Sequence, residues 1–211
     1  MIEKIRRSIN SGKYETDLYI EFTKFQQDED SLILTCSIYI EEAEEGKLVE
    51  QWLIQCLDWQ DYRLESFISW EEEEFEVTND HPFLWDYHES LIELYFRGEP
   101  TEILALIGAL YLKHCSLTEN LIPLSQYVNI NAGAGDLEKL LNGNHGLFSM
   151  APQILTEAYR ELLEAYGFST SLLMQKEMQH PEEFKLLRLG PSYIIAKEFK
   201  AIQLDIENFS V

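Results

Sequence analysis

Two aspartates and two histidines lie close together in the middle of the chain, at Asp80, His81, Asp86 and His88. Imidazole nitrogens and carboxylate oxygens together suit zinc, manganese or iron. Asp86 and His88 share a face only if the segment is extended, because alternate residues of a strand point to the same side. In the competing interpretation, Asp80 caps a turn that continues through Pro82 and the histidines pack at a sheet edge. A metal-dependent hydrolase that uses His81, Asp86 and His88 is therefore kept as an alternative.

Motifs for nucleophilic catalysis are incomplete. Residues 167–171 read Gly-Phe-Ser-Thr-Ser, which lacks the last glycine of a GxSxG elbow and follows a predicted helix rather than a strand. His114 and Cys115 are neighbours on a predicted helix, so their side chains diverge by about 100° and cannot form a base and thiolate pair. The sequence therefore predicts no catalytic residue.

Two segments resemble ligand loops only in part. Residues 129–136 contain two glycines and open a helix, but they lack the GK[ST] ending of a phosphate loop, and Asp136 would repel an anion. Asp28, Glu29 and Asp30 begin like a calcium loop, but Leu32 follows where oxygen ligands are needed. We therefore expect no cofactor, and we interpret Asp136 as a helix cap.

Acidic side chains dominate the first half of the chain. Of the formal net charge of −22, −18 falls between Asp28 and Glu93, where Lys47 and Arg63 are the only basic residues. Nucleic acid and anionic membranes are disfavoured as partners, because their binding depends on clustered Lys and Arg. A basic protein remains as a partner, and the candidate contacts are Glu41, Glu42, Glu44, Glu45, Glu71, Glu72, Glu73 and Glu74.

The same region is rich in residues that form a core. Hydrophobic residues make up 45% of the chain, and the acidic region holds all four tryptophans, so we expect it to fold rather than to be disordered. Three cysteines without a CxxC pair indicate a reduced, cytoplasmic protein. The N-terminus does not resemble a signal peptide, and the longest apolar run, residues 103–112, falls short of the roughly 20 residues that span a bilayer.

Apolar residues with a period of two predict antiparallel strands near residues 14–25, 32–40, 48–59, 62–70, 75–77 and 90–97, with a short turn at 81–88. Because loops of a meander alternate between its two ends, Asp28 to Asp30 should lie near Asp58 and Asp61, and opposite the glutamates of residues 41–45. Whether all these acids form one surface is left open by the sequence.

The pattern changes to a helical period after Pro100. It predicts a largely buried helix at about 101–116, a short helix at 137–142 and a stronger helix that begins after Pro152 and ends at Gly167. His145 is expected in a turn between the last two helices. Alternation returns in residues 185–189, 193–199 and 201–206, which are interpreted as strands.

These elements predict an α+β fold in a single domain over residues 1–211. An N-terminal antiparallel sheet, about 14–97, is packed by a helical segment, about 100–167, and C-terminal strands return to the sheet. The sub-regions are acidic and β-rich (1–98), mainly helical (99–180) and again β (181–211). The function that fits best is that of a soluble, non-catalytic interaction or regulatory protein, inhibitor-like or immunity-like, that binds a basic protein. Besides the metal-dependent hydrolase described above, a third possibility is a structural or small-ligand-binding protein with a pocket near Tyr159 and Tyr166.

Overall fold

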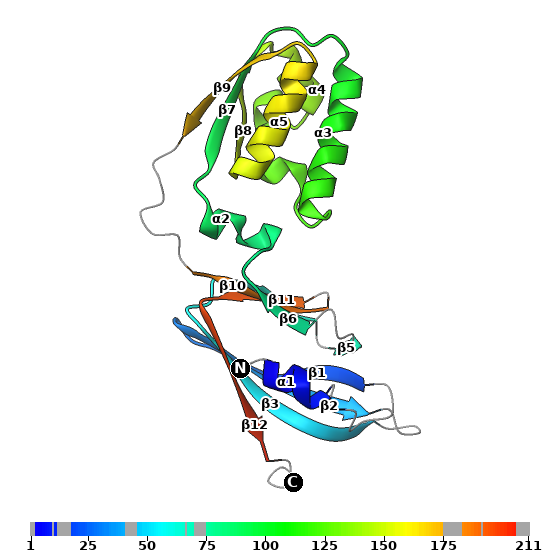
Figure 1. Cartoon of the computed structure of the whole chain (residues 1–211), viewed down its shortest axis with the longest axis vertical. Coiled ribbons are helices and arrows are strands. Elements are labelled where there is room, and N and C mark those ends of the chain that lie inside the picture. The colour runs from blue at the N-terminus through cyan, green and yellow to red at the C-terminus, as the bar shows by residue number, and fades with distance from the viewer. Residues whose placement is uncertain are drawn as a thin grey trace. The chain divides into compact units, whose positions relative to one another are not determined.

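A computed structural model describes the chain over residues 3–9, 11, 18–40, 46–65, 67–69, 75–174, 183–190 and 192–205. The chain forms two compact units (Figure 1). Unit 1 combines Met1–Leu84 with Glu183–Val211, and unit 2 is the continuous segment Trp85–Glu182. The single domain expected from the sequence stays a prediction, because a division into compact units does not measure whether they unfold together.

Unit 1 contains two antiparallel sheets in its described residues. Sheet A has the order β12-β3-β2-β1-β5, with strands β12 (Glu198–Leu204), β3 (Lys47–Leu57), β2 (Ser31–Ile40), β1 (Leu18–Gln27) and β5 (Phe67–Ser69). Sheet B has the order β4-β11-β10-β6, with strands β4 (Asp61–Arg63), β11 (Ser192–Ala196), β10 (Lys185–Leu189) and β6 (Phe75–Thr78). The predicted meander is confirmed for β1, β2 and β3, whereas β6 joins sheet B and β7 (Ile92–Arg97) belongs to unit 2. The predicted return of the C-terminal strands is confirmed, with β12 in sheet A and β10 and β11 in sheet B.

The expected strand at 62–70 is divided between the two sheets. β4 pairs with β11 in sheet B, whereas β5 pairs with β1 in sheet A. The sequence pattern could not separate them, since each piece has only three residues.

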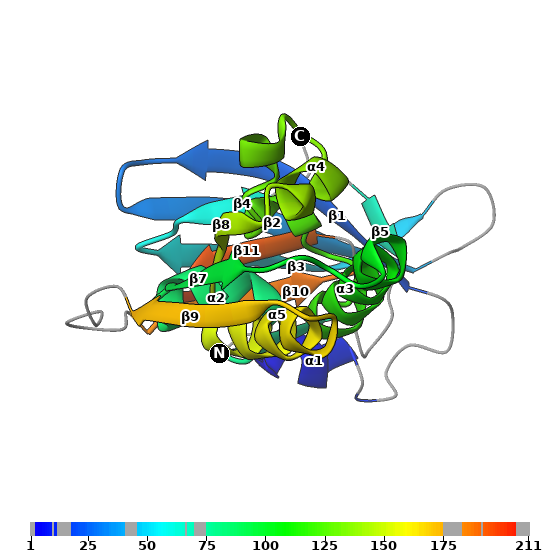
Figure 2. The same ribbon diagram turned by 90° about the horizontal axis from the view of Figure 1, so that it is seen from above.

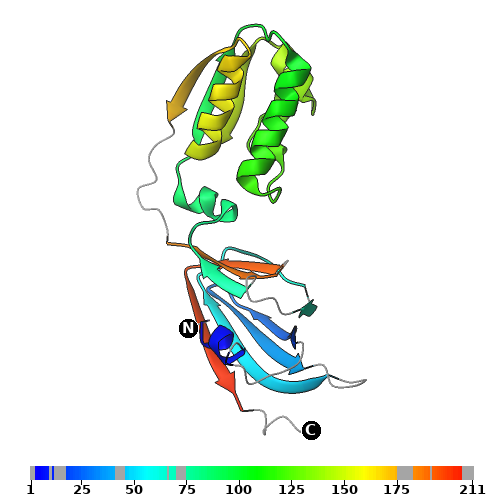
Figure 3. The same cartoon turned by 45° about the vertical axis from the view of Figure 1, so that its right-hand side comes forward.

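The core of unit 1 joins sheet A, sheet B and α1 (Glu3–Ile9). Cys36 of β2, Ile54 of β3 and Leu187 of β10 are fully buried in it. α1 lies against the strands of this unit and contributes Ile5 and Ile9, four residues apart on one helix face (Figure 3). The sequence analysis did not predict α1, because seven residues with two apolar anchors are too short for a periodic signal.

Unit 2 is a three-stranded antiparallel sheet with helices packed on it. The strand order is β8-β7-β9, with β8 (His145–Ala151), β7 (Ile92–Arg97) and β9 (Ser169–Met174). The helical elements are α2 (Trp85–His88), α3 (Ile103–Thr118), α4 (Leu137–Asn142) and α5 (Gln153–Ala165); 3-10 turns occur at η2 (Pro82–Leu84, in unit 1), η3 (Leu124–Gln126) and η4 (Ile130–Gly133). α3 and α5 lie side by side in both views, and α5 contacts all three strands (Figures 1 and 2).

The α+β class with an N-terminal antiparallel sheet is confirmed. The helices α4 and α5 begin after Asp136 and Pro152, as the sequence predicted. Asp136 caps α4 by accepting hydrogen bonds from the backbone amides of Glu138 (2.9 Å) and Lys139 (3.3 Å). The helices cover β7 of the expected sheet, together with β8 and β9. The expected turn at His145 is wrong, because His145 begins β8 and pairs with Arg97.

The sequence predicted that α3 would be largely buried, but only one side of the helix is buried. Leu106, Leu110 and His114 face the interior of unit 2 with at most 1% exposure. On the opposite side Leu104 is 71% exposed and Leu112 is 75% exposed. The helix is apolar around its circumference, but the fold of one chain covers only one of its sides.

Candidate functional site

Five described acidic residues of unit 1 gather at one end of the meander formed by β1, β2 and β3. The β1–β2 turn carries Asp28, Glu29 and Asp30, and the chain that leaves β3 carries Asp58 and Asp61. All five residues are exposed. We call this set the acidic end. Its formation confirms the predicted alternation of meander loops, since connections separated by two antiparallel strands, here β2 and β3, lie at the same end of the sheet.

Two hydrogen bonds to backbone carbonyl oxygens hold the two acidic segments side by side. The amide of Asp58 donates to the carbonyl oxygen of Asp30 (2.9 Å), and the indole Nε1 of Trp59 donates to the carbonyl oxygen of Asp28 (3.2 Å). Asp58 adopts a left-handed backbone conformation (φ 50°), which Asp tolerates better than most residues. Both hydrogen bonds are accepted by main-chain oxygens of the turn, so the carboxylates of Asp28 and Asp30 take no part in them.

Aromatic side chains lie beside these carboxylates. The ring of Tyr62 is 5.5 Å from that of Trp59, edge-on, and 5.1 Å from that of Phe25. Phe25 is 46% exposed, and the other two rings are half-buried. Aromatic rings rimmed by charged groups are typical of binding surfaces, because they supply contact area at a low cost in side-chain entropy.

Two contacts tie the acidic end to the C-terminal strands. Lys197 Nζ lies 3.8 Å from Asp58 Oδ2, with both side chains partly exposed, and the hydroxyl of Tyr193 donates to Asp61 Oδ2 (2.9 Å). A partly exposed ion pair of this kind contributes little stability and is screened by salt. The surface therefore keeps a negative character despite Lys197.

The partner contacts proposed from the sequence, Glu41, Glu42, Glu44, Glu45, Glu71, Glu72, Glu73 and Glu74, lie outside the described residues. The acidic end was noted in the sequence as a set of turns, but it was not selected as a site. The signal that could have selected it is the meander rule combined with Trp59 and Tyr62 in the second turn.

The candidate metal ligands have other partners in the structure. His81 Nδ1 accepts a hydrogen bond from the amide of Phe83 (3.2 Å), so His81, rather than Asp80, caps the turn. Asp86 accepts hydrogen bonds from Tyr127 Oη (2.8 Å) and Gln126 Nε2 (3.2 Å). Burial, together with Asp86, raises the pKa of Tyr127 well above its usual range, which keeps this phenol a donor.

The geometric condition for the metal interpretation is not met. Asp86 and His88 both lie on α2, where residues two apart point to different sides, whereas the interpretation needs an extended segment. Across the described ranges, no three His, Cys, Asp or Glu side chains are grouped as a metal site would require.

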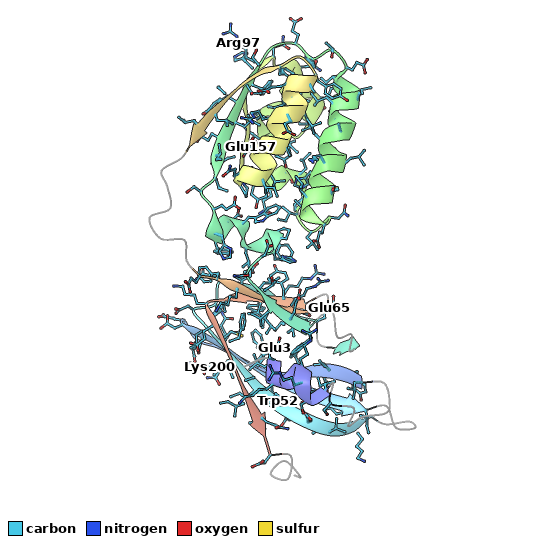
Figure 4. All side chains as sticks on the ribbon, viewed as in Figure 1. Glu3, Trp52, Glu65, Arg97, Glu157 and Lys200 are labelled. Carbon is cyan, nitrogen blue, oxygen red and sulfur yellow. The ribbon has the colours of Figure 1, made fainter. Side chains whose placement is uncertain are left out.

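The two cysteines of sheet A are not suited to nucleophilic chemistry. Burial, together with the nearby Glu50, raises the pKa of Cys36 to about 12, and burial alone raises that of Cys56 to about 12. Glu50 is itself buried and accepts hydrogen bonds from Ser8 Oγ of α1 (2.6 Å) and Trp52 Nε1 (2.9 Å), so its carboxylate joins α1 to β3. Figure 4 labels Trp52 on sheet A. These groups hold the fold of unit 1 together.

The residues named for a ligand pocket belong to a packed interior. Tyr159 is fully buried, and its hydroxyl lies 2.7 Å from His114 Nδ1; His114 Nε2 lies 2.7 Å from the carbonyl oxygen of Ile122. The carbonyl can only accept, so Nε2 carries the proton and Nδ1 accepts from Tyr159. Tyr166 is half-buried at the end of α5. The small-ligand alternative stays a prediction.

Comparisons of the chain with protein-family models, with curated proteins and with solved structures give no match. None of the helices within the described part of the chain is long and apolar enough to cross a membrane.

Proposed function

We propose that this protein is a non-catalytic binding protein whose acidic end takes up a basic segment of a partner protein, in the manner of an inhibitor or immunity protein. The observation that carries the proposal is the pairing of the two acidic turns through the Asp58–Asp30 and Trp59–Asp28 hydrogen bonds. Five carboxylates and the rings of Phe25, Trp59 and Tyr62 are thereby gathered at the acidic end. A cytoplasmic location is part of the proposal, because the three cysteines are free thiols.

The chemistry of the acidic end favours arginine over lysine in the partner. A guanidinium can donate two parallel hydrogen bonds to the oxygens of a carboxylate and can also stack on the face of Trp59 or Tyr62. The ammonium of lysine is more strongly hydrated and makes only point contacts. We therefore expect a partner segment rich in arginine, bound with a rate that falls as salt is added.

The test uses an oligo-arginine peptide as a defined probe, with an oligo-lysine peptide of equal length beside it. Binding to the full chain is followed by tryptophan fluorescence and calorimetry at low and at physiological salt. A Trp59→Phe variant identifies the part of the fluorescence change that comes from the acidic end. We expect tighter binding of the arginine peptide and a loss of affinity with salt.

Two variants with equal charge separate a specific surface from bulk acidity. The first is Asp28→Asn with Glu29→Gln and Asp30→Asn, which leaves the main-chain hydrogen bonds of the turn in place. The control is Glu99→Gln with Glu138→Gln and Glu161→Gln, three exposed residues of unit 2. We expect at least a tenfold weakening in the first variant only. Equal weakening in both would reduce the interaction to net charge and would contradict the proposal.

A further inference from the structure

The strand β9 forms an open edge of the sheet in unit 2. In the order β8-β7-β9, β7 is the only strand that pairs with β9 among the described residues (Figure 1). The opposite edge, β8, is covered, because the amide of Met150 donates to the carbonyl oxygen of Tyr127 (3.0 Å) and the amide of Asn129 donates to that of Phe148 (2.7 Å). Within the described part of the chain, the open edge of this sheet is therefore the one that β9 provides.

The direction of the backbone groups in β7 follows from a hydrogen bond at its end. The amide of Gly98 donates to the carbonyl oxygen of Asn144, which precedes β8 (2.8 Å). Successive residues of a strand point their N–H and C=O groups alternately to its two sides. The groups of Tyr95, three residues before Gly98, therefore point toward β9.

The same alternation shows which groups of β9 lie on its open edge. Tyr95 lies opposite Ser171, and directly opposed residues that face each other exchange their backbone hydrogen bonds. Ser171 is therefore bonded to β7. Its neighbours Thr170 and Leu172 point their N–H and C=O groups to the other side, away from β7. Such a row of donors and acceptors is a template for a further strand.

β9 lacks the features that protect edge strands from pairing. Proteins protect open edges with charged side chains, proline or β-bulges. β9 contains no charged residue and no proline, and its register with β7 is uninterrupted over its whole length. By contrast, β12, an edge strand of sheet A, carries Glu198 and Lys200. Leu172 and Leu173 point to opposite faces of the sheet and are 39% and 56% exposed.

We propose that β9 pairs with β9 of a second copy of this chain, antiparallel, about a two-fold axis between the two Ser171 residues. Thr170 of each copy then lies opposite Leu172 of the other. Because both residues direct their backbone groups outward, they exchange hydrogen bonds on each side of the axis. The pairing joins the two three-stranded sheets into one continuous sheet.

The side chains of β9 favour this register. The two Ser171 residues form a pair without backbone hydrogen bonds, in which opposed side chains come closest together. Serine is small enough for that position, and its hydroxyl can both donate and accept a hydrogen bond. Leu172 lies beside Thr170 of the other copy and Leu173 beside Ser169, so each leucine packs against a smaller side chain. Every residue from 169 to 173 has a partner in this register.

The distribution of charge fits a second copy at this edge. On β7, Glu93 lies opposite Leu173 and Arg97 lies opposite Ser169. Since Leu173 faces Ser169 of the other copy, Glu93 of one copy and Arg97 of the other lie in the same row across the joined sheet. A parallel pair in register would instead align like charges in each row. An uncharged edge calls for an uncharged extended strand, and each chain supplies one in its own β9.

The first measurement is the molar mass of the full chain by sedimentation, from low micromolar to several hundred micromolar protein. One pair of strands buries less area than most stable interfaces, so we expect a weak dimer that forms as the concentration rises. A wild-type chain that stays monomeric over the whole range would overturn the proposal.

Charge variants at the axis test whether β9 forms the interface. Ser171 is exposed, so Ser171→Lys and Ser171→Glu should each leave unit 2 folded. Each variant alone should weaken the dimer several-fold, because like charges then lie directly opposite each other. An equal mixture of the two should restore the dimer, which a folding defect would not allow. The matched control is Ser116→Lys, at an exposed position of α3, which should dimerise like the wild type.

Three results of this series would contradict the pairing of β9. They are a dimer that Ser171→Lys does not weaken, a mixture that does not restore it, and a control variant that weakens it equally.

A disulfide tests the position of the two-fold axis. In a Cys115→Ser background, Ser171→Cys should form a disulfide between two copies under mild oxidation, because residue 171 lies opposite itself at a suitable separation. Leu173→Cys should form one much more slowly, because residue 173 is displaced from the axis. Cys36 and Cys56 are buried and take no part. Faster formation at residue 173 than at residue 171 would contradict this register.

Discussion

The buried His114 makes the stability of unit 2 depend on pH in a way that can be worked out from its surroundings. Its ring is 1% exposed, donates from Nε2 to the carbonyl of Ile122 and accepts at Nδ1 from Tyr159. Burial lowers the pKa of His114 from its usual value near 6.5, and the bond to Ile122 offsets only part of this. The folded chain therefore holds His114 neutral at a pH where the unfolded chain has begun to protonate it.

The sign and size of the effect follow from proton linkage. Between the folded pKa and about 6.5, the unfolded chain binds more protons than the folded chain, so stability falls as the pH falls. The full contribution is present above about pH 6.5. Between about pH 7.5 and pH 5.5 the loss is at most about 1.4 kcal/mol, the limit reached when the folded chain takes up no proton.

The assay compares the wild type with His114→Gln, which cannot titrate but can still donate and accept hydrogen bonds. Urea unfolding at the two pH values gives the free energy of unfolding of each, and hydrogen exchange of α3 amides reports on unit 2 itself. Titration of the carboxylates is common to both proteins and cancels in the difference. Between the two pH values, the free energy of unfolding of the wild type should fall by up to about 1.4 kcal/mol more than that of the variant.

The same pH dependence in both proteins would refute this reasoning. It would mean that His114 takes up its proton equally well in the folded and unfolded chains. A His145→Gln variant serves as the control, because His145 is exposed and should behave as the wild type.

Two further substitutions test buried polar groups. Ser8→Ala removes a donor to the buried Glu50 and should lower the free energy of unfolding by about 1–2 kcal/mol in urea titrations, whereas Ser11→Ala, at an exposed hydrogen bond, should change it little. An equal effect of both would contradict the anchoring role of Glu50. Ser149→Ala should raise the free energy of unfolding by about 1 kcal/mol, since Ser149 Oγ is fully buried with no hydrogen-bond partner among the described residues. A lower free energy of unfolding would show that this hydroxyl does have a partner.

Local signals in the sequence predicted most of the elements. The short helix from Leu137 to Asn142 was predicted with its bounds, because Asp136 is a strong cap and Gly143 follows the last turn. Pro152 marked the start of α5, and the alternation of apolar residues marked β1, β2 and β3. These signals act over a few residues, so they can be interpreted without knowledge of the fold.

Elements with weak or disturbed patterns were missed. β8 contains a bulge next to Phe148, which leaves Phe148 and Ser149 both buried, so the period of two is lost. β9 and α1 are six and seven residues long and have few apolar anchors. Their structure depends on partners far along the chain, such as Leu94 for β9 and Glu50 for α1.

The candidate site was predicted only in outline. The meander rule placed Asp28 to Asp30 near Asp58, but the hydrogen bond of Trp59 and the packing of Phe25 on Tyr62 could not be inferred from spacing. The acidic segments selected from the sequence, at residues 41–45 and 71–74, were chosen by local charge density. Local density cannot tell which loops meet, because that depends on strand order.

The sequence by itself determined the acidity of the chain, the class of its elements and the alternating meander, since each follows from residue type and short-range period. Only the tertiary structure decided which acidic turns adjoin, which sheet the helices cover and which side of α3 remains uncovered. Those properties depend on contacts between residues far apart in the chain, and α3 illustrates the difference. Its sequence calls for burial on every side, while the fold of one copy provides cover for Leu106 and Leu110 and leaves Leu104 and Leu112 exposed.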